Sequence, residues 1–107
     1  HVHISYVHCV MPELRFEWDP KKAAANLAKH GVPFPEAKTA FSDELGFMLE
    51  DPAHSADEDR FILLGLSASL RVLVVVHCLR ERGHVIRLIS ARPASRRERA
   101  QYTERNS

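Results

Sequence analysis

Apolar and charged residues alternate over residues 14–19, which is the period expected of a short, half-buried strand. Asp19 is a favoured N-cap residue, and Pro20 suits the first turn of a helix because its missing N–H group would have no partner there. The sequence therefore predicts a helix that begins at Pro20. It should end at His30, because Gly31 can take the left-handed conformation that closes a helix.

The rest of the chain predicts a second short helix from Pro35, then four strands, then a final helix capped by Ser95. The four strands are predicted at residues 46–50, 60–66, 72–78 and 84–92. The apolar run at 72–76 is typical of a central strand covered on both faces. This order predicts an α+β domain in which an antiparallel sheet carries two N-terminal helices and a C-terminal helix on one side.

Length and composition indicate one domain, because the chain has 107 residues and 45% hydrophobic content. We expect this domain to span residues 11–107 and residues 1–10 to be a non-native or upstream extension, since Met11 is a plausible natural start. The histidines of this extension and Cys9 match no closed zinc site in their spacing. No apolar run approaches the ~20 residues that span a bilayer. We therefore expect a cytoplasmic protein without membrane contact, metal or cofactor.

Charge changes this picture, because the chain is nearly neutral overall but its charges are segregated. Residues 43–59 carry seven carboxylates and no lysine or arginine, whereas residues 80–99 carry seven arginines against two glutamates. Guanidinium groups present paired donors that match phosphate oxygens. The arginine-rich segment therefore predicts a surface for a polyanion, with RNA or DNA as the first candidate.

Blocks of residues after Met11 form a series that covers nearly all of the remaining chain. The first blocks are residues 16–22 (FEWDPKK), 24–27 (AANL) and 29–32 (KHGV). The later blocks are residues 58–61 (EDRF), 65–67 (GLS), 81–83 (ERG) and 86–92 (IRLISAR), followed by Glu98, Arg99 and Tyr102. In this order they resemble the BrnT-type toxin family. The chain departs from the family pattern in a longer segment before residues 81–83 and in its N-terminal extension.

The resemblance implies a RelE-like α+β fold and the toxin half of a type II toxin–antitoxin pair. It also implies a ribonuclease that blocks translation. The implied partner is a BrnA-type antitoxin, which would cover the toxin and bind promoter DNA, so that the toxin would reach DNA only through the antitoxin. RNA is the implied substrate.

Metal-independent RNA cleavage needs a base for the ribose 2′-OH, positive charge on the phosphate and an acid for the leaving 5′-oxygen. Residue types suited to these roles give a predicted catalytic set of Lys29, His30, Glu58, Arg60, Arg82, Arg87 and Arg92. The residues predicted to bind RNA are Lys22, Asn26, Arg80, Arg96, Arg97 and Tyr102. Helical spacing places Lys22, Asn26, Lys29 and His30 on one face of the first helix.

Arg87 and Arg92 are the preferred phosphate-binding pair, although their spacing raises a difficulty. Simple alternation along a strand puts them on opposite faces, unless a bulge realigns them. A structural role is the alternative for each residue, for example an ion pair between Arg87 and the acidic segment. Lys29 and His30 would also favour the helix dipole simply by standing in the last turn.

Several alternatives stay open at the level of sequence. Arg96 and Arg97 could form a solvated helix face, and Tyr102 could cover the core. His54 and His77 are alternative proton-transfer groups. For the whole protein, the alternatives are a non-catalytic module that binds nucleic acid or protein, and a degenerate toxin that acts only in a repressor complex.

Overall fold

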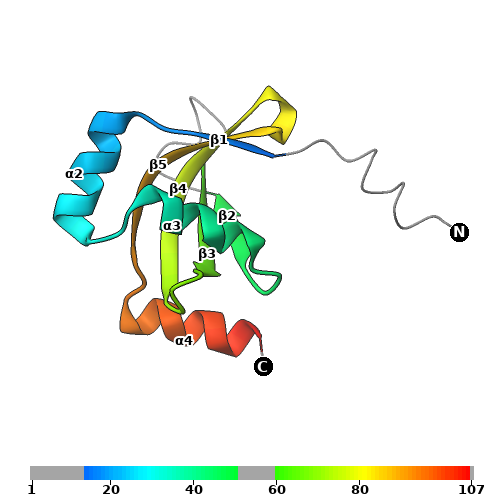
Figure 1. The fold of residues 1–107 in the computed structure, drawn as a ribbon. Coiled ribbons are helices and arrows are strands. Elements are labelled where there is room, and N and C mark those ends of the chain that lie inside the picture. Colours follow the sequence, from blue (N-terminus) through cyan, green and yellow to red (C-terminus); the bar gives the residue numbers. More distant parts are fainter. Residues whose placement is uncertain (1–13, 51–59, 107) are drawn as a thin grey trace, which may run out of the picture.

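The computed structural model describes residues 14–50 and 60–106 of the chain (Figure 1). Its strands are β1 (Arg15–Glu17), β2 (Phe47–Glu50), β3 (Arg60–Leu66), β4 (Val72–Arg80) and β5 (Val85–Pro93). Its α-helices are α2 (Pro20–His30), α3 (Phe34–Thr39) and α4 (Arg96–Arg105), and two 3-10 turns are η1 (Ala40–Ser42) and η2 (Glu81–Gly83). Each predicted element is present, and its ends lie within two residues of the predicted bounds. The α+β class is confirmed.

The strands form one five-stranded sheet in the order β1-β5-β4-β3-β2. Strands β2 to β5 are the predicted antiparallel meander. The expectation of a wholly antiparallel sheet is wrong at one edge, because β1 runs parallel to β5 with Glu17 opposite Arg87. The long connection between these two strands contains α2 and α3, which gives the chain room to return in the same direction.

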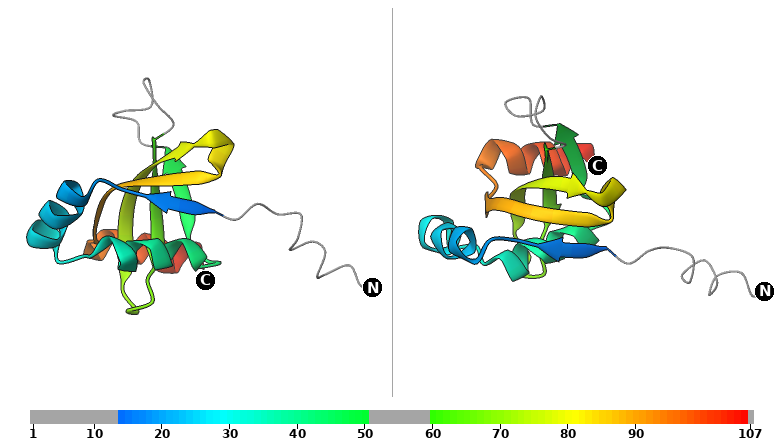
Figure 2. Two further views of the ribbon diagram at one scale, coloured as in Figure 1. Left: turned by 45° about the horizontal axis from the view of Figure 1, so that its top comes forward. Right: turned by 90° about the horizontal axis from the view of Figure 1, so that it is seen from above.

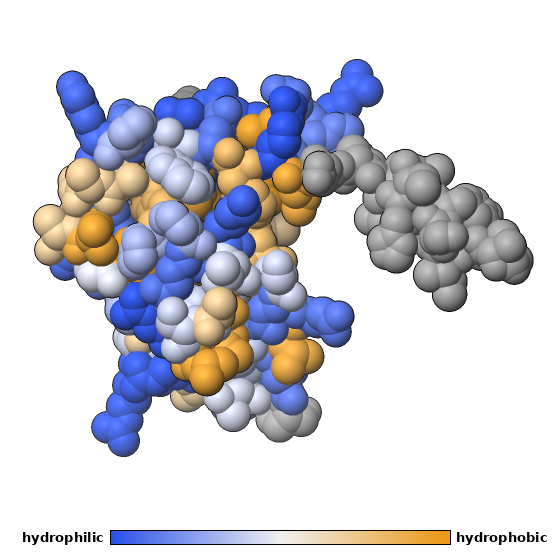
Figure 3. Space-filling view, viewed as in Figure 1, coloured by the Kyte–Doolittle hydropathy of each residue, from blue (hydrophilic) through white to orange (hydrophobic). Residues whose placement is uncertain are grey.

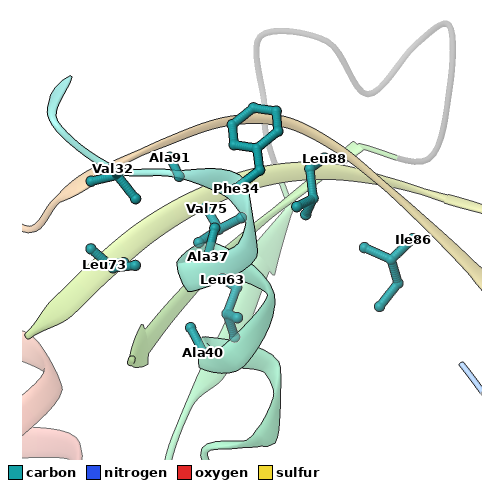
Figure 4. Close-up of a cluster of buried hydrophobic side chains, with 10 residues drawn as sticks. All are labelled: Val32, Phe34, Ala37, Ala40, Leu63, Leu73, Val75, Ile86, Leu88 and Ala91. Atoms are coloured by element: carbon teal, nitrogen blue, oxygen red, sulfur yellow. The ribbon is translucent and has the colours of Figure 1, made fainter. Parts of the chain in front are cut away.

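The sheet lies between helices rather than under them, so the prediction that all helices cover one side is wrong (Figure 2). On one face, Phe34 and Ala37 of α3 pack on Leu63, Val75 and Leu88 of the sheet, and these residues are buried (Figure 4). On the other face, α4 packs through Tyr102 against Leu64 and Val74. Strands β3 and β4 are apolar on both faces, and both faces therefore need a cover.

The ends of the two longer helices follow the predicted capping chemistry. The Asp19 carboxylate accepts a hydrogen bond from the Lys21 backbone N–H at 2.9 Å, and Gly31 closes α2 with a φ of 70°. At α4, Ser95 and Glu98 form a capping box, in which each side chain accepts a hydrogen bond from the other residue's backbone N–H. Both helix starts are therefore fixed by local sequence.

Strand β5 contains a bulge that decides which face its side chains take. Val76 of β4 pairs with Ser90, whereas the next residue pairs with Leu88, so Ile89 is the extra residue. Leu88 and Ala91 consequently both face α3, although they are three positions apart. From Ser90 onward, each side chain takes the opposite face from the one that uninterrupted alternation would give it. Arg87, Ser90 and Arg92 therefore share the face that α4 covers in part.

Beyond the bulge, β5 has α2 rather than a strand as its neighbour. β1 pairs only with residues 85–87 of β5. Further along, the amide of Asn26 donates to the Ala91 carbonyl at 2.8 Å and accepts from the Ala91 N–H at 3.0 Å. Its second amide hydrogen bonds the Val32 carbonyl at 3.0 Å. Asn26 thus completes the hydrogen bonding of the exposed strand edge and fixes α2 to the sheet.

Two contacts anchor α4. The Tyr102 hydroxyl donates to the Asp43 carboxylate at 2.5 Å, and burial together with this carboxylate raises the pKa of Tyr102 to about 12. At the other end of the helix, Arg92 donates two hydrogen bonds of 2.8 Å to Glu98. The Arg92 guanidinium and the Ser95 cap outweigh the effect of burial and lower the pKa of Glu98 to about 2.

Replacement of Asn26 by alanine tests the role of this side chain at the strand edge. We expect Asn26→Ala to lower the free energy of unfolding by about 3 kcal/mol, because the change leaves buried donors and acceptors at Ala91 without partners. Urea unfolding measures the loss. Lys21→Ala on the exposed side of α2 is the control and should change stability by less than about 0.5 kcal/mol. Equal stability of the two variants would contradict this role.

The Arg92–Glu98 pair predicts a pH-dependent contribution to stability. The pKa of Glu98 is lowered from 4.5 to about 2 in the folded chain, so the pair stabilises the fold above pH 4.5 and loses its effect as the pH falls toward 2. Because Arg92 is partly exposed, we expect Arg92→Gln to cost only about 1 kcal/mol at pH 7 and less at pH 3. Urea unfolding at the two pH values, with Arg97→Gln as control, measures this. The same loss at both pH values would refute the assignment.

Candidate nucleic-acid interface

Four residues lie side by side across four strands of the sheet. The strand register places Arg60 of β3 opposite Cys78 of β4, Cys78 opposite Arg87 of β5, and Arg87 opposite Glu17 of β1. Alternation along each strand places all four on the face that α4 covers in part. We call these four residues the arginine row. Figure 1 shows α4 at the end of the sheet away from β1, so the row lies beyond the end that α4 covers.

The arginine row carries positive charge at two points on the sheet. Neighbouring strands lie about 4.8 Å apart, so the backbones of Arg60 and Arg87 are separated by roughly 10 Å. Cys78 between them is buried, whereas the Arg87 side chain is 34% exposed. Two long guanidinium side chains at this spacing can reach one phosphate group together. The geometry therefore suits an anion held over the centre of the row.

Glu17 forms ion pairs with Arg87 of the row and with the neighbouring Arg80. Its carboxylate lies 3.0 Å from Nη1 of Arg87 and 3.9 Å from Nε of Arg80, which follows Cys78 by two residues on the same face. Next to this group, Arg15 pairs with Glu81 at 2.7 Å. Arg80 and Arg87 therefore share the single carboxylate of Glu17. The ion pair of Arg87 within the described residues is formed with Glu17 of β1, and residues 51–59 of the acidic segment considered from the sequence lie outside the described part of the chain.

Arg92 has a structural role at this site. Its guanidinium makes a bidentate pair with Glu98, so a carboxylate in the first turn of α4 compensates the charge of Arg92. The bulge does bring Arg92 to the face of Arg87, as its predicted role required. We nevertheless leave Arg92 out of the proposed phosphate-binding pair, because both of its terminal nitrogens already bond the Glu98 carboxylate.

A second group of predicted residues meets in a cleft between α2 and β5. Lys22, Asn26, Lys29 and His30 line this cleft together with Ile89 and Ser90, and its volume is about 230 Å³. The predicted common face of the helix is therefore present. Asn26, however, uses both amide hydrogens and its oxygen within the protein. We leave it out of the residues proposed to contact RNA.

The remaining predicted residues are dispersed. Arg82 lies at the β4–β5 hairpin tip in a left-handed conformation with a φ of 58°. Arg96 and Arg97 are exposed on α4, and the hydroxyl of Tyr102 is bonded to Asp43. Glu58, His54 and residues 1–10 lie outside the described part of the chain.

His77 is unsuited to the proton-transfer role considered from the sequence. It is fully buried on the α3 side of the sheet, where the rings of Phe41 and Phe61 contact its imidazole. Burial lowers the pKa of His77. A substrate bound at the surface cannot reach this ring.

Glu17 and Arg15 are the residues of this interface that sequence reasoning missed. The alternating pattern of β1 puts both on the same side of the strand, and that signal was available. Their position beside Arg87 could not be predicted from the sequence, because it depends on the parallel pairing of β1 with β5.

Other features of the described residues lie away from the arginine row. A cavity of about 810 Å³ opens on the α3 side between β1, α3 and the β3–β4 turn, and no predicted site residue lines it. The surface on that side is a mixture of polar and apolar side chains (Figure 3). Within residues 14–50 and 60–106, no three His, Cys, Asp or Glu side chains meet where a metal ion could be held. No helix of this part is long and apolar enough to cross a membrane.

Comparisons with known proteins bear on the family and the fold. Residues 18–98 match the family model described as "Ribonuclease toxin, BrnT, of type II toxin-antitoxin system". The structure is similar to the crystal structure of the Brucella abortus ribonuclease toxin BrnT, with a TM-score of 0.61 and 25% sequence identity. This match covers 78% of the present chain and 99% of the Brucella chain. A search of curated proteins found no match. From the extent of the family match and the shared fold, the chain belongs to the BrnT family of ribonuclease toxins of type II toxin–antitoxin systems.

Proposed function

We propose that this protein is a metal-independent endoribonuclease that cleaves RNA at the arginine row and thereby inhibits translation. The observation that carries the proposal is the register of β3, β4, β5 and β1, which sets Arg60 and Arg87 on either side of Cys78 on one face of the sheet. Membership of a ribonuclease toxin family supports RNA as the substrate. Only RNA offers the 2′-OH nucleophile on which metal-independent cleavage depends.

In the proposed reaction, the ribose 2′-oxygen attacks the adjacent phosphorus and the bond to the 5′-oxygen breaks. The products are a 2′,3′-cyclic phosphate and a 5′-hydroxyl. Negative charge builds up on the phosphate oxygens during this step, and the guanidinium groups of Arg60 and Arg87 stabilise it. Since both residues stand on the sheet and Glu17 pairs with Arg87, these groups need little reorganisation when the charge develops.

We assign removal of the 2′-OH proton to Glu17, and the 5′-oxygen takes its proton from water at this exposed face. The Glu17 carboxylate lies 3.0 Å from the guanidinium of Arg87, so a phosphate bound by Arg87 would place its 2′-OH close to a proton acceptor. This assignment replaces Lys29 and His30 in the proton-transfer role. Those two residues line the cleft beside β5 and not the row itself.

The proposed partner is a BrnA-type antitoxin that neutralises the toxin by covering the arginine row. The type II family description supports an antitoxin partner. A face on which Arg60, Arg80 and Arg87 lie on neighbouring strands favours a partner that brings carboxylates to it. Contact with promoter DNA would then occur through the antitoxin.

Cleavage of synthetic RNA in excess EDTA tests the proposed activity. We expect the purified, partner-free protein to cut the RNA and to leave 2′,3′-cyclic phosphate ends. Arg60→Ala and Arg87→Ala should each lower the cleavage rate by about 10²-fold or more, because each removes a charge from the transition state. Arg97→Ala, an exposed change on α4, serves as the control and should cut at the parent rate.

Other outcomes of this experiment would contradict the proposal. Loss of cleavage in EDTA and its return with Mg²⁺ would refute metal independence. RNA that is bound but not cut under any condition would favour the non-catalytic binding module.

A separate variant tests the role of Glu17. Glu17→Gln keeps an oxygen that accepts a hydrogen bond from Arg87 but cannot take up a proton. We expect its cleavage rate to fall by about 10²-fold or more while its affinity for RNA stays within about twofold of the parent. An unchanged cleavage rate would show that Glu17 only positions Arg87.

A further inference from the structure

Two features fix the shape of the cleft between α2 and β5: the hydrogen bonds of the Asn26 side chain and the bulge in β5. Asn26 bonds both backbone groups of Ala91 and so fixes the distance from α2 to the strand. The bulge at Ile89 then turns Ser90 to the face of the sheet that carries Arg87. Ile89 and Ser90 form the strand side of the cleft.

The chemistry of the cleft is that of an anion site. Lys22, Lys29 and His30 line its helix side, and the residues that line it include no carboxylate. The Asn26 amide at its base has no hydrogen left to donate, so the lysine ammonium groups and the Ser90 hydroxyl are the donors for a ligand. Throughout α2, from Pro20 to His30, there are three lysines and no Asp or Glu. Nothing in this helix compensates the positive charge of the cleft.

The position of the cleft relates it to the arginine row. Ser90 follows Arg87 by three residues on the same strand and the same face, which corresponds to about 10 Å along β5. A short stretch of single-stranded RNA can span this distance. An RNA chain with one phosphate over the row would therefore carry a neighbouring phosphate into the cleft.

We propose that the α2–β5 cleft is a second phosphate subsite, in which Lys22 and Lys29 bind an RNA phosphate that flanks the one held by Arg60 and Arg87. The proposal rests on the proposed function for the nature of its ligand, RNA. It gives Lys29 and His30 a role in binding substrate and not in moving protons. It also sets the path of the bound RNA, whose backbone runs along β5 from the arginine row toward α2.

The salt dependence of RNA binding provides the test. The probe is a fluorescent 2′-O-methyl RNA of about ten nucleotides, which keeps its phosphates but cannot be cut, and its affinity is measured by anisotropy at several salt concentrations. Each phosphate contact with single-stranded nucleic acid adds about 0.7 to the slope of log K against log salt. We expect Lys22→Ala/Lys29→Ala, which removes the one phosphate contact of the cleft, to lower that slope by about 0.7 and to weaken binding about tenfold or more at low salt.

A matched control removes the same charge elsewhere. Lys21→Ala/Lys38→Ala takes two exposed lysines from outside the cleft, and Lys38 lies on the α3 side over the Phe16 ring. This control should keep the slope of the parent. A dinucleotide, which carries a single phosphate, should bind the parent and the cleft variant equally, because the arginine row alone can hold it.

The outcomes separate this proposal from the proposed function. If the parent does not cut RNA but the slope falls only in the cleft variant, the subsite stands and the nuclease assignment fails. If the cleft variant and the matched control give the same slope, the subsite is refuted. A cleft variant that binds RNA like the parent but loses affinity for an acidic protein partner would also refute it, and would assign the cleft to a protein interface.

Discussion

The register shift between β4 and β5 is the constraint on which the functional surface depends. One extra residue, Ile89, separates two stretches of β5 that would otherwise alternate in step. Before the shift, Leu88 fills the core while Arg87 faces the opposite side; after it, Ala91 fills the core while Ser90 and Arg92 face that side. A regular strand could not combine these positions with a continuous core under α3. The bulge therefore allows one strand to serve the core, the arginine row and the α2–β5 cleft.

The same strand edge explains why two different elements lie beside β5. β1 is only three residues long and ends where the bulge approaches. Beyond it, backbone groups of β5 would be exposed as an unpaired edge, which promotes aggregation and costs hydrogen bonds. Asn26 satisfies both groups of Ala91 with one side chain, so a helix takes the place of a strand. The cleft between α2 and β5 follows from this exchange, because a helix cannot lie as close to a strand as another strand does.

Local rules predicted the elements of this fold well and their arrangement less well. The Asp19 and Ser95 caps, the Gly31 terminus and the β-strand alternation depend on neighbours in sequence, and the structure confirms them. The parallel pairing of β1 with β5 and the place of α4 on the second face depend on residues far apart in the chain. For the site, the same distinction applies. The shared face of Lys22, Lys29 and His30 could be read from helical spacing, whereas the row from Arg60 to Glu17 requires the register of four strands.

The pairing of Glu17 with Arg87 has a consequence for the synthesis of the protein. The meander β2 to β5 is built from neighbouring hairpins and can form from local contacts, but β1 must wait for a strand 70 residues later. A chain that emerges from the ribosome with its N-terminus first holds β1 and α2 ready before β5 exists. The arginine row and the cleft are therefore completed together, and only when almost the whole chain has been made. A translation product truncated before β5 would retain α2, α3 and the β2–β3 hairpin without either anion-binding surface.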